Sequence, residues 1–89
     1  MIGNRRTGYP VQLVDGHPAV AELPLRDGEE MEVRLDGKWL TGIVRFSPSD
    51  GWGIVLATNP DGTGTLVNVA LRDGMLLRWP LRRRALRAG

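Results

Sequence analysis

The sequence predicts a small all-β domain, and three observations support this fold class. Turn-forming clusters of glycine, proline, aspartate and asparagine recur about every 9–15 residues along the chain. The segments between them are rich in valine, leucine, isoleucine, threonine and tryptophan, which suit a pleated, half-buried surface. No segment carries a long apolar stripe at helical spacing. A chain of 89 residues forms one domain at most.

The clearest element is a β-hairpin over residues 30–47 that turns at Asp36-Gly37. Apolar and charged residues alternate along residues 30–35, as in a strand with one buried face. A two-residue Asp-Gly turn needs positive φ and sets the register, which places Arg34 opposite Trp39. The expected core face is Met31, Val33, Leu35, Leu40, Val44 and Phe46, and the expected outer face is Glu30, Glu32, Arg34, Trp39, Thr41, Ile43 and Arg45.

A second hairpin is expected to turn at residues 48–51 through a four-residue loop that places Ser47 opposite Trp52. In this register the outer face collects five apolar residues, too many to leave in water. We expect a cover from an N-terminal hairpin, in which residues 11–14 turn at 15–16 into residues 19–23, or from a partner protein or second copy. The five residues are Trp39, Ile43, Trp52, Ile54 and Leu56.

The tetrapeptide Leu-Arg-Asp-Gly occurs twice, at residues 25–28 and 71–74, and each copy precedes a predicted strand. We interpret the two copies as the same turn chemistry, a leucine in the core followed by an Asp-Gly bend. The remaining predicted strands are 65–69 and 75–79. The predicted organisation is an N-terminal arm (1–10), a single domain (11–81) that includes the N-terminal hairpin (11–23), and an arginine-rich tail (82–89).

Five short strands, tight hairpins and an irregular turn before the last strand run through residues 25–81. The motifs are Leu25-x-Asp-Gly28, Met31-x-Val33-x-Leu35, Gly37-Lys38-Trp39-x-Thr41-Gly42-x-Val44, Gly51-Trp52-Gly53-x-Val55 and Leu71-x-Asp-Gly74-x-x-x-Arg78. With these motifs the chain resembles the small bacterial SH3-like barrels filed as domains of unknown function. The resemblance implies a small five-stranded SH3-like barrel, with the N-terminal hairpin and the basic C-terminal tail as additions, and it implies no activity.

The chain lacks the residue combinations of the common catalytic and metal sites. It has no cysteine and a single histidine, His17, which excludes thiolate sites and multi-histidine metal centres. Ser47 and Ser49 stand at a turn, and no sequence pattern groups them with His17 as a hydrolytic triad. The glycine-rich residues 62–64 lack the Lys-Ser/Thr of a phosphate loop. We therefore expect no enzyme, with no catalytic residues, no cofactor and no metal.

The N-terminal and hydropathy patterns bear on location. No apolar run approaches the ~18–20 residues that span a bilayer. Residues 1–10 are polar and do not resemble a signal peptide. The expectation is a soluble, cytoplasmic protein without a membrane partner.

The net charge of +2 is unevenly distributed. Residues 1–6 carry +2, residues 7–81 carry −4 and residues 82–89 carry +4. An acidic body repels phosphate, so any nucleic-acid binding rests on the two ends, where arginine grips phosphate with a planar fork. The tail also fits a solvated terminus or a contact with an acidic partner surface. The candidate nucleic-acid-binding residues are Arg82, Arg83, Arg84, Arg87, Arg5 and Arg6.

These features predict a non-enzymatic binding module that contacts nucleic acid through its arginine-rich ends, as an accessory of a larger bacterial or mobile-element complex. The alternative is a protein-interaction or self-assembly module that uses the outer apolar face around Trp39 and Trp52. A cation–π contact between Trp39 and Arg34 fits either surface. The predicted interaction surface is Trp39, Arg34, Arg45, Ile43, Trp52 and Ile54.

Overall fold

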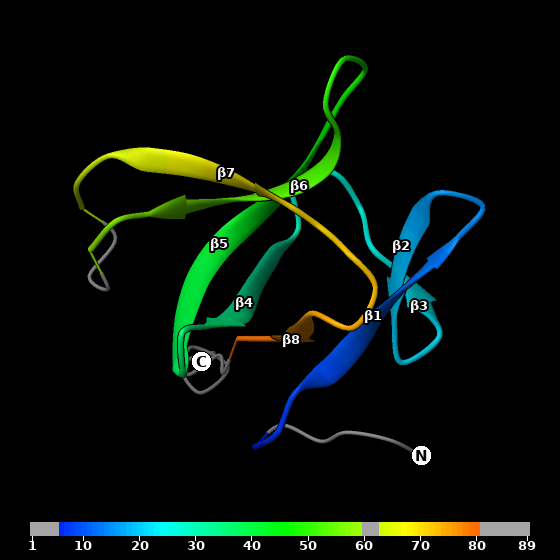
Figure 1. Ribbon diagram of the computed structural model, residues 1–89, viewed down its shortest axis with the longest axis horizontal. Helices are drawn as coiled ribbons and strands as arrows, with labels where there is room; N and C mark the ends of the chain where they lie inside the picture. Colours follow the sequence, from blue (N-terminus) through cyan, green and yellow to red (C-terminus); the bar gives the residue numbers. More distant parts are fainter. Residues whose placement is uncertain (1–5, 60–62, 81–89) are drawn as a thin grey trace, which may run out of the picture.

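The computed structural model describes residues 6–59 and 63–80, and within these ranges the chain is all-β, as predicted (Figure 1). Every strand pair is antiparallel, and the strands form one open sheet in the order β3-β2-β1-β8-β4-β5-β6-β7. The strands are β1 (Tyr9–Val14), β2 (His17–Val20), β3 (Leu23–Pro24), β4 (Glu30–Leu35), β5 (Lys38–Ser47), β6 (Gly51–Ala57), β7 (Leu66–Ala70) and β8 (Leu76–Arg78).

The register predicted for the β4–β5 hairpin is confirmed, and so is the Asp15-Gly16 turn of the N-terminal hairpin, whose second strand is His17–Val20 instead of the expected 19–23. In β4–β5, Arg34 pairs with Trp39 around the Asp36-Gly37 turn. In β1–β2, Val14 pairs with His17. Both turns have positive φ at their two central residues, which is the backbone that Asp-Gly favours in a two-residue hairpin.

The register predicted for the β5–β6 hairpin is wrong by one residue. Ser47 pairs with Gly51, so the loop has three residues, and Gly51 adopts a φ of 81° where it rejoins the ladder. A shift of one residue moves every side chain of a strand to the other face. Ile54 is therefore fully buried instead of lying on the outer face. Phe46, expected in the core, lies near the hairpin end with 48% of its surface exposed.

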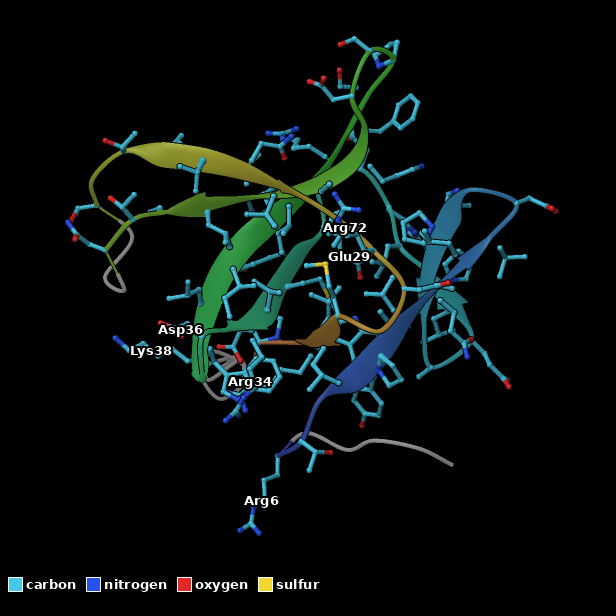
Figure 2. The ribbon with its side chains drawn as sticks, in the orientation of Figure 1. Arg6, Glu29, Arg34, Asp36, Lys38 and Arg72 are labelled. Carbon is cyan, nitrogen blue, oxygen red and sulfur yellow. The ribbon has the colours of Figure 1, made fainter. Side chains whose placement is uncertain are left out.

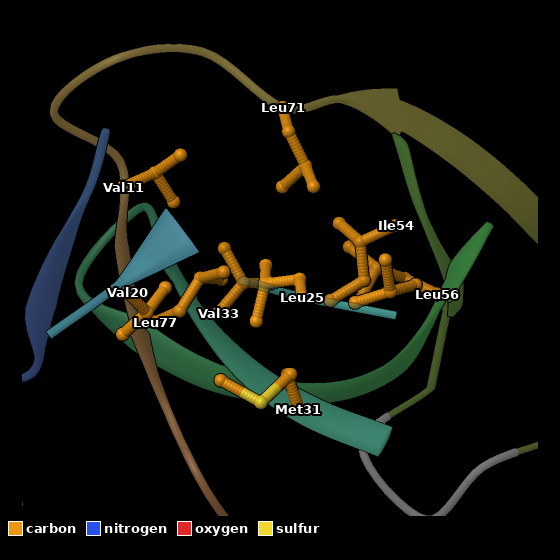
Figure 3. Close-up of a cluster of buried hydrophobic side chains, with 10 residues drawn as sticks. Val11, Val20, Leu25, Met31, Val33, Ile54, Leu56, Leu71 and Leu77 are labelled. Carbon is orange, nitrogen blue, oxygen red and sulfur yellow. The ribbon is translucent and has the colours of Figure 1, made fainter. Parts of the chain in front are cut away.

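The N-terminal hairpin extends the sheet and does not cover the outer face. β1 pairs with β8, with Tyr9 opposite Leu77. The hairpin contributes Val11 and Val20 to the same core that β4 and β6 line (Figure 3). The buried cluster is Val11, Val20, Leu25, Met31, Val33, Val44, Ile54, Leu56, Leu71 and Leu77.

The sheet has an internal two-fold relationship between two units of four strands, β1–β4 and β5–β8. Exchanging β1 with β5, β2 with β6, β3 with β7 and β4 with β8 reverses the strand order and reproduces the same neighbours. The pair Glu32–Arg78, where β4 meets β8, maps onto itself. The register matches residue by residue: Val11↔Val20 with Val44↔Ile54, Leu13↔Pro18 with Phe46↔Trp52, Val20↔Leu23 with Ile54↔Val69, and Tyr9↔Leu77 with Gly42↔Met31.

The first Leu-Arg-Asp-Gly turn, residues 25–28, connects β3 to β4 and forms hydrogen bonds with β5, the first strand of the other unit. The Phe46 amide donates to Asp27 Oδ1 over 2.9 Å. The Gly28 amide donates to the Val44 carbonyl oxygen over 2.6 Å. The turn therefore holds β5 at two positions two residues apart.

The second turn, residues 71–74, makes the equivalent bonds in the other direction. The Leu13 amide donates to Asp73 Oδ1 over 2.8 Å. The Gly74 amide donates to the Val11 carbonyl oxygen over 2.9 Å. The interpretation that both turns use one chemistry is confirmed, and the structure adds that each turn fastens the leading strand of the opposite unit.

Candidate functional site

Trp39 lies on the outer face of β5, next to the β4–β5 turn, between two arginines. The guanidinium carbon of Arg34 lies 5.6 Å from the centre of the Trp39 ring, so the predicted cross-strand pair is present. The guanidinium carbon of Arg78 lies closer, at 4.1 Å. Arg78 also donates through Nε to the Glu32 carboxylate, and only 18% of each of these two side chains is exposed. The charge of Arg78 is thus largely compensated, whereas Arg34 is exposed.

The start of β1 passes beneath Trp39. Gly8 is buried there, and a Cβ atom on it would lie 2.6 Å from Cη2 of the indole. Glycine allows this approach without moving the indole, and its φ of 84° is one that residues with a side chain rarely adopt. The segment that leads to the N-terminus therefore leaves the fold beside Trp39. We call Trp39 and its neighbours Arg34, Arg78 and Glu32 the Trp39 cluster.

The two ends of the described chain leave from the same place. Tyr9 pairs with Leu77 in antiparallel orientation, so Arg6 and Pro80 lie at the same end of the β1–β8 pair. Figure 2 shows Arg6, Arg34 and Lys38 in the lower part of the view, away from Arg72. The fold thus places cationic side chains from two separate parts of the sequence, Arg6 and the β4–β5 turn, toward one end of the molecule.

Some predicted site residues belong to this surface and others do not. Arg34, Trp39, Ile43 and Arg45 share the outer face through strand alternation. Trp52 and Ile54 are on the core face of β6, because of the shifted register. The proposed patch of five apolar residues therefore does not form. Arg5, Arg82, Arg83, Arg84 and Arg87 lie outside the described residues.

The serines and the histidine are committed to separate contacts. Ser47 and Ser49 share a hydrogen bond of 3.0 Å between their hydroxyl oxygens. His17 Nε2 lies 3.0 Å from the Leu25 carbonyl oxygen, and its ring packs edge-on against Trp52. No group of three metal-ligating side chains occurs in the part of the chain that the structure describes. These residues also form no helix of the length and hydropathy needed to cross a membrane.

Sequence reasoning missed Arg78 as part of this cluster. Its position depends on which strand β8 joins, and that pairing spans 46 residues of sequence between Glu32 and Arg78. Comparison with known proteins adds no relative: no family model, curated protein or solved structure matches the chain.

Proposed function

We propose that the protein is a non-enzymatic nucleic-acid-binding module whose interface is the end of the sheet where β1 begins and β8 stops. The observation that carries the proposal is the β1–β8 register, which brings Arg6 and Pro80 to the same end. Residues 1–6 and 82–89, with charges of +2 and +4, adjoin these two positions in the chain. Both charged segments therefore join the described fold at the same end of the β1–β8 pair.

The surface beside this end supports the assignment. Arg34 is exposed next to Trp39, and Lys38 is exposed at the adjacent turn. Asp36 lies in the same turn, but most acidic side chains of the body lie elsewhere and disfavour phosphate, so a nucleic acid is steered to this end and not to the sheet as a whole. Arginine at phosphate gives affinity without base specificity, which suits an accessory subunit of a larger bacterial or mobile-element complex.

We also propose the SH3-like class for strands β4–β8. Their order, β8-β4-β5-β6-β7, is a meander whose last strand returns to pair with the first. This arrangement agrees with the motifs in residues 25–81. Strands β1–β3 then form an addition to these five strands, joined to them through β8.

Deleting residues 82–89 tests the nucleic-acid assignment. We expect the full chain to bind duplex or single-stranded DNA or RNA at ~50 mM salt and to lose about 100- to 1,000-fold in affinity by ~200 mM, since each phosphate contact contributes a slope of about 0.9 in log–log form. Deletion should reduce that slope by about 3–4. Mobility-shift titrations at several salt concentrations measure both quantities.

Point variants control for a general effect of charge. Arg34→Gln should weaken binding about equally for all sequences and lower the slope by about 1. Arg72→Gln removes the same charge at an exposed position away from this end and should leave binding unchanged. Absence of binding at ~50 mM salt, or binding that survives the deletion, would refute the proposal.

A second candidate is self-association through the β7 edge. β7 stands at one edge of the sheet, and its residues 66–70 contain neither charge nor proline, the usual features that protect an edge from pairing. Leu66 and Val67 are 66% and 42% exposed. A second copy would pair its own β7 in antiparallel orientation and extend the sheet across a two-fold axis.

Sedimentation velocity over a range of concentrations tests the second candidate. The unmodified chain should show a concentration-dependent dimer, and Val67→Lys should shift it to monomer because a lysine on an edge strand disfavours strand pairing. Leu13→Lys places the same charge on an exposed apolar residue of β1 and should leave the dimer intact. A chain that stays monomeric at every concentration contradicts this candidate.

A further inference from the structure

A groove of about 940 Å³ lies at the first Leu-Arg-Asp-Gly turn, and Trp39 is not among its lining residues. Two indoles, Trp52 and Trp79, contribute to its walls together with apolar residues of β3. Its charged lining residues are Arg26, Asp27 and Glu29, with a net charge of −1. The proposed nucleic-acid interface uses none of these side chains.

The Glu29 carboxylate is held in the groove by two donors. The Arg26 amide donates to Oε1 over 3.1 Å, and Trp79 Nε1 donates to Oε2 over 3.3 Å. A carboxylate has about four acceptor positions, so two are used and two are left for a ligand. Glu29 makes no ion pair within residues 6–59 and 63–80, although the Arg26 side chain lines the same groove.

The second turn shows that the fold does not need this carboxylate. At the position equivalent to Glu29 stands Met75, whose sulfur accepts the Arg72 amide over 3.1 Å. The two-fold relationship places Val33 where the first unit has Trp79. The same backbone turn thus forms with a thioether and an aliphatic neighbour, and the paired carboxylate and indole are an additional feature of the first turn.

The indoles are fixed by neighbouring rings. Trp52 packs against His17 with ring centres 4.7 Å apart and against Phe46 at 5.1 Å. Trp79 packs against Tyr9 at 5.7 Å. Rigid indole faces beside an oriented carboxylate favour a cation, because the ring quadrupole and the carboxylate attract it together.

We propose that this groove binds an arginine side chain of a partner polypeptide. A guanidinium is planar, so it stacks on an indole while two of its N–H groups reach the two remaining acceptor positions of Glu29. A lysine ammonium offers a point charge without the flat stacking surface, so the groove should prefer arginine. The groove therefore gives the protein a peptide-recognition site whose lining side chains differ from the cationic residues of the proposed nucleic-acid interface.

Indole N–H signals in a two-dimensional NMR titration test the proposal, with Trp39 as an internal reference outside the groove. The probe is acetyl-glycyl-arginyl-glycine amide, compared with the same peptide carrying lysine or citrulline. We expect the signals of Trp79 and Trp52 to shift with the arginine peptide while Trp39 stays in place. The lysine peptide should bind more weakly, and the neutral citrulline peptide should cause no shift.

Glu29→Gln is the matched variant, since its amide oxygen still accepts one of the two internal hydrogen bonds. It should weaken arginine-peptide binding at least tenfold, which corresponds to about 1.4 kcal/mol. Asp36→Asn changes the charge equally at the far β4–β5 turn and should have no effect (Figure 2).

Three results would overturn the proposal. The first is an equal shift with citrulline, and the second is unchanged binding by Glu29→Gln. The third is a peptide that binds only after residues 82–89 are deleted, since the occupant would then be an arginine of this chain and not of a partner.

Discussion

Replacing Leu25 or Leu71 with alanine should lower the free energy of unfolding by about 2–5 kcal/mol in each case. Both side chains are buried in the shared core. Leu25 follows β3 and Leu71 follows β7, which are equivalent strands of the two units. Their amides donate to backbone carbonyls of Pro18 and Trp52, which are equivalent positions in the two units. A domain of this size has about 4–13 kcal/mol of total stability, so either variant removes a large part of it.

Equilibrium unfolding in urea, followed by tryptophan fluorescence and circular dichroism, measures the two losses. Leu23→Ala is the control: its side chain is exposed on β3, two residues before Leu25, and the change should cost less than about 0.5 kcal/mol. The double variant should fail to fold. If only one of the two leucines proved costly, the turns would not be equivalent in packing, and the two-fold account of the core would be wrong.

The local part of the fold was readable from sequence because Asp-Gly turns combine a defined backbone with a defined register. The β1–β2 and β4–β5 pairs follow from that chemistry. The β5–β6 turn did not, because a glycine after aspartate serves equally inside a four-residue loop or as the first paired residue after a three-residue loop. Gly51 takes the second role, and the change carries Ile54 into the core.

Local sequence patterns did not indicate which distant strands pair. The repeated Leu-Arg-Asp-Gly indicated a shared turn. The equivalent strand segments of the two units, such as 11–14 and 44–47, share little sequence beyond their apolar pattern. The β1–β8 pairing that unites the two ends depends on the whole core. Local signals therefore predicted the hairpins and left the order of the sheet open.

The candidate sites divide in the same way. The Arg34–Trp39 contact followed from a hairpin register, whereas Arg78 joined the cluster through a distant strand. The groove at Glu29 had one signal in the sequence. Glutamate follows the first Asp-Gly and methionine follows the second, a difference that gains meaning only when the two turns are seen to make the same bonds.

Gly42→Ala should lower the free energy of unfolding by about 2–3 kcal/mol through overpacking. Gly42 is buried in β5, opposite Met31 on one side and Leu56 on the other. A Cβ atom there would lie 2.6 Å from the Val55 carbonyl oxygen and 2.5 Å from Leu56 Cδ2. The leucine can change its rotamer, but the carbonyl belongs to the neighbouring strand, so relief requires β5 and β6 to separate.

A second substitution distinguishes these two clashes. Shortening the neighbouring side chain in Gly42→Ala/Leu56→Val removes the flexible contact and should restore little stability, because the backbone contact persists. Thr41→Ala, at the exposed neighbouring position, should change stability by less than about 0.5 kcal/mol. Full rescue by Leu56→Val would show that the side chain alone limits the space. Failure of Leu56→Val to restore stability would show that Gly42 is required for the close approach of β5 and β6.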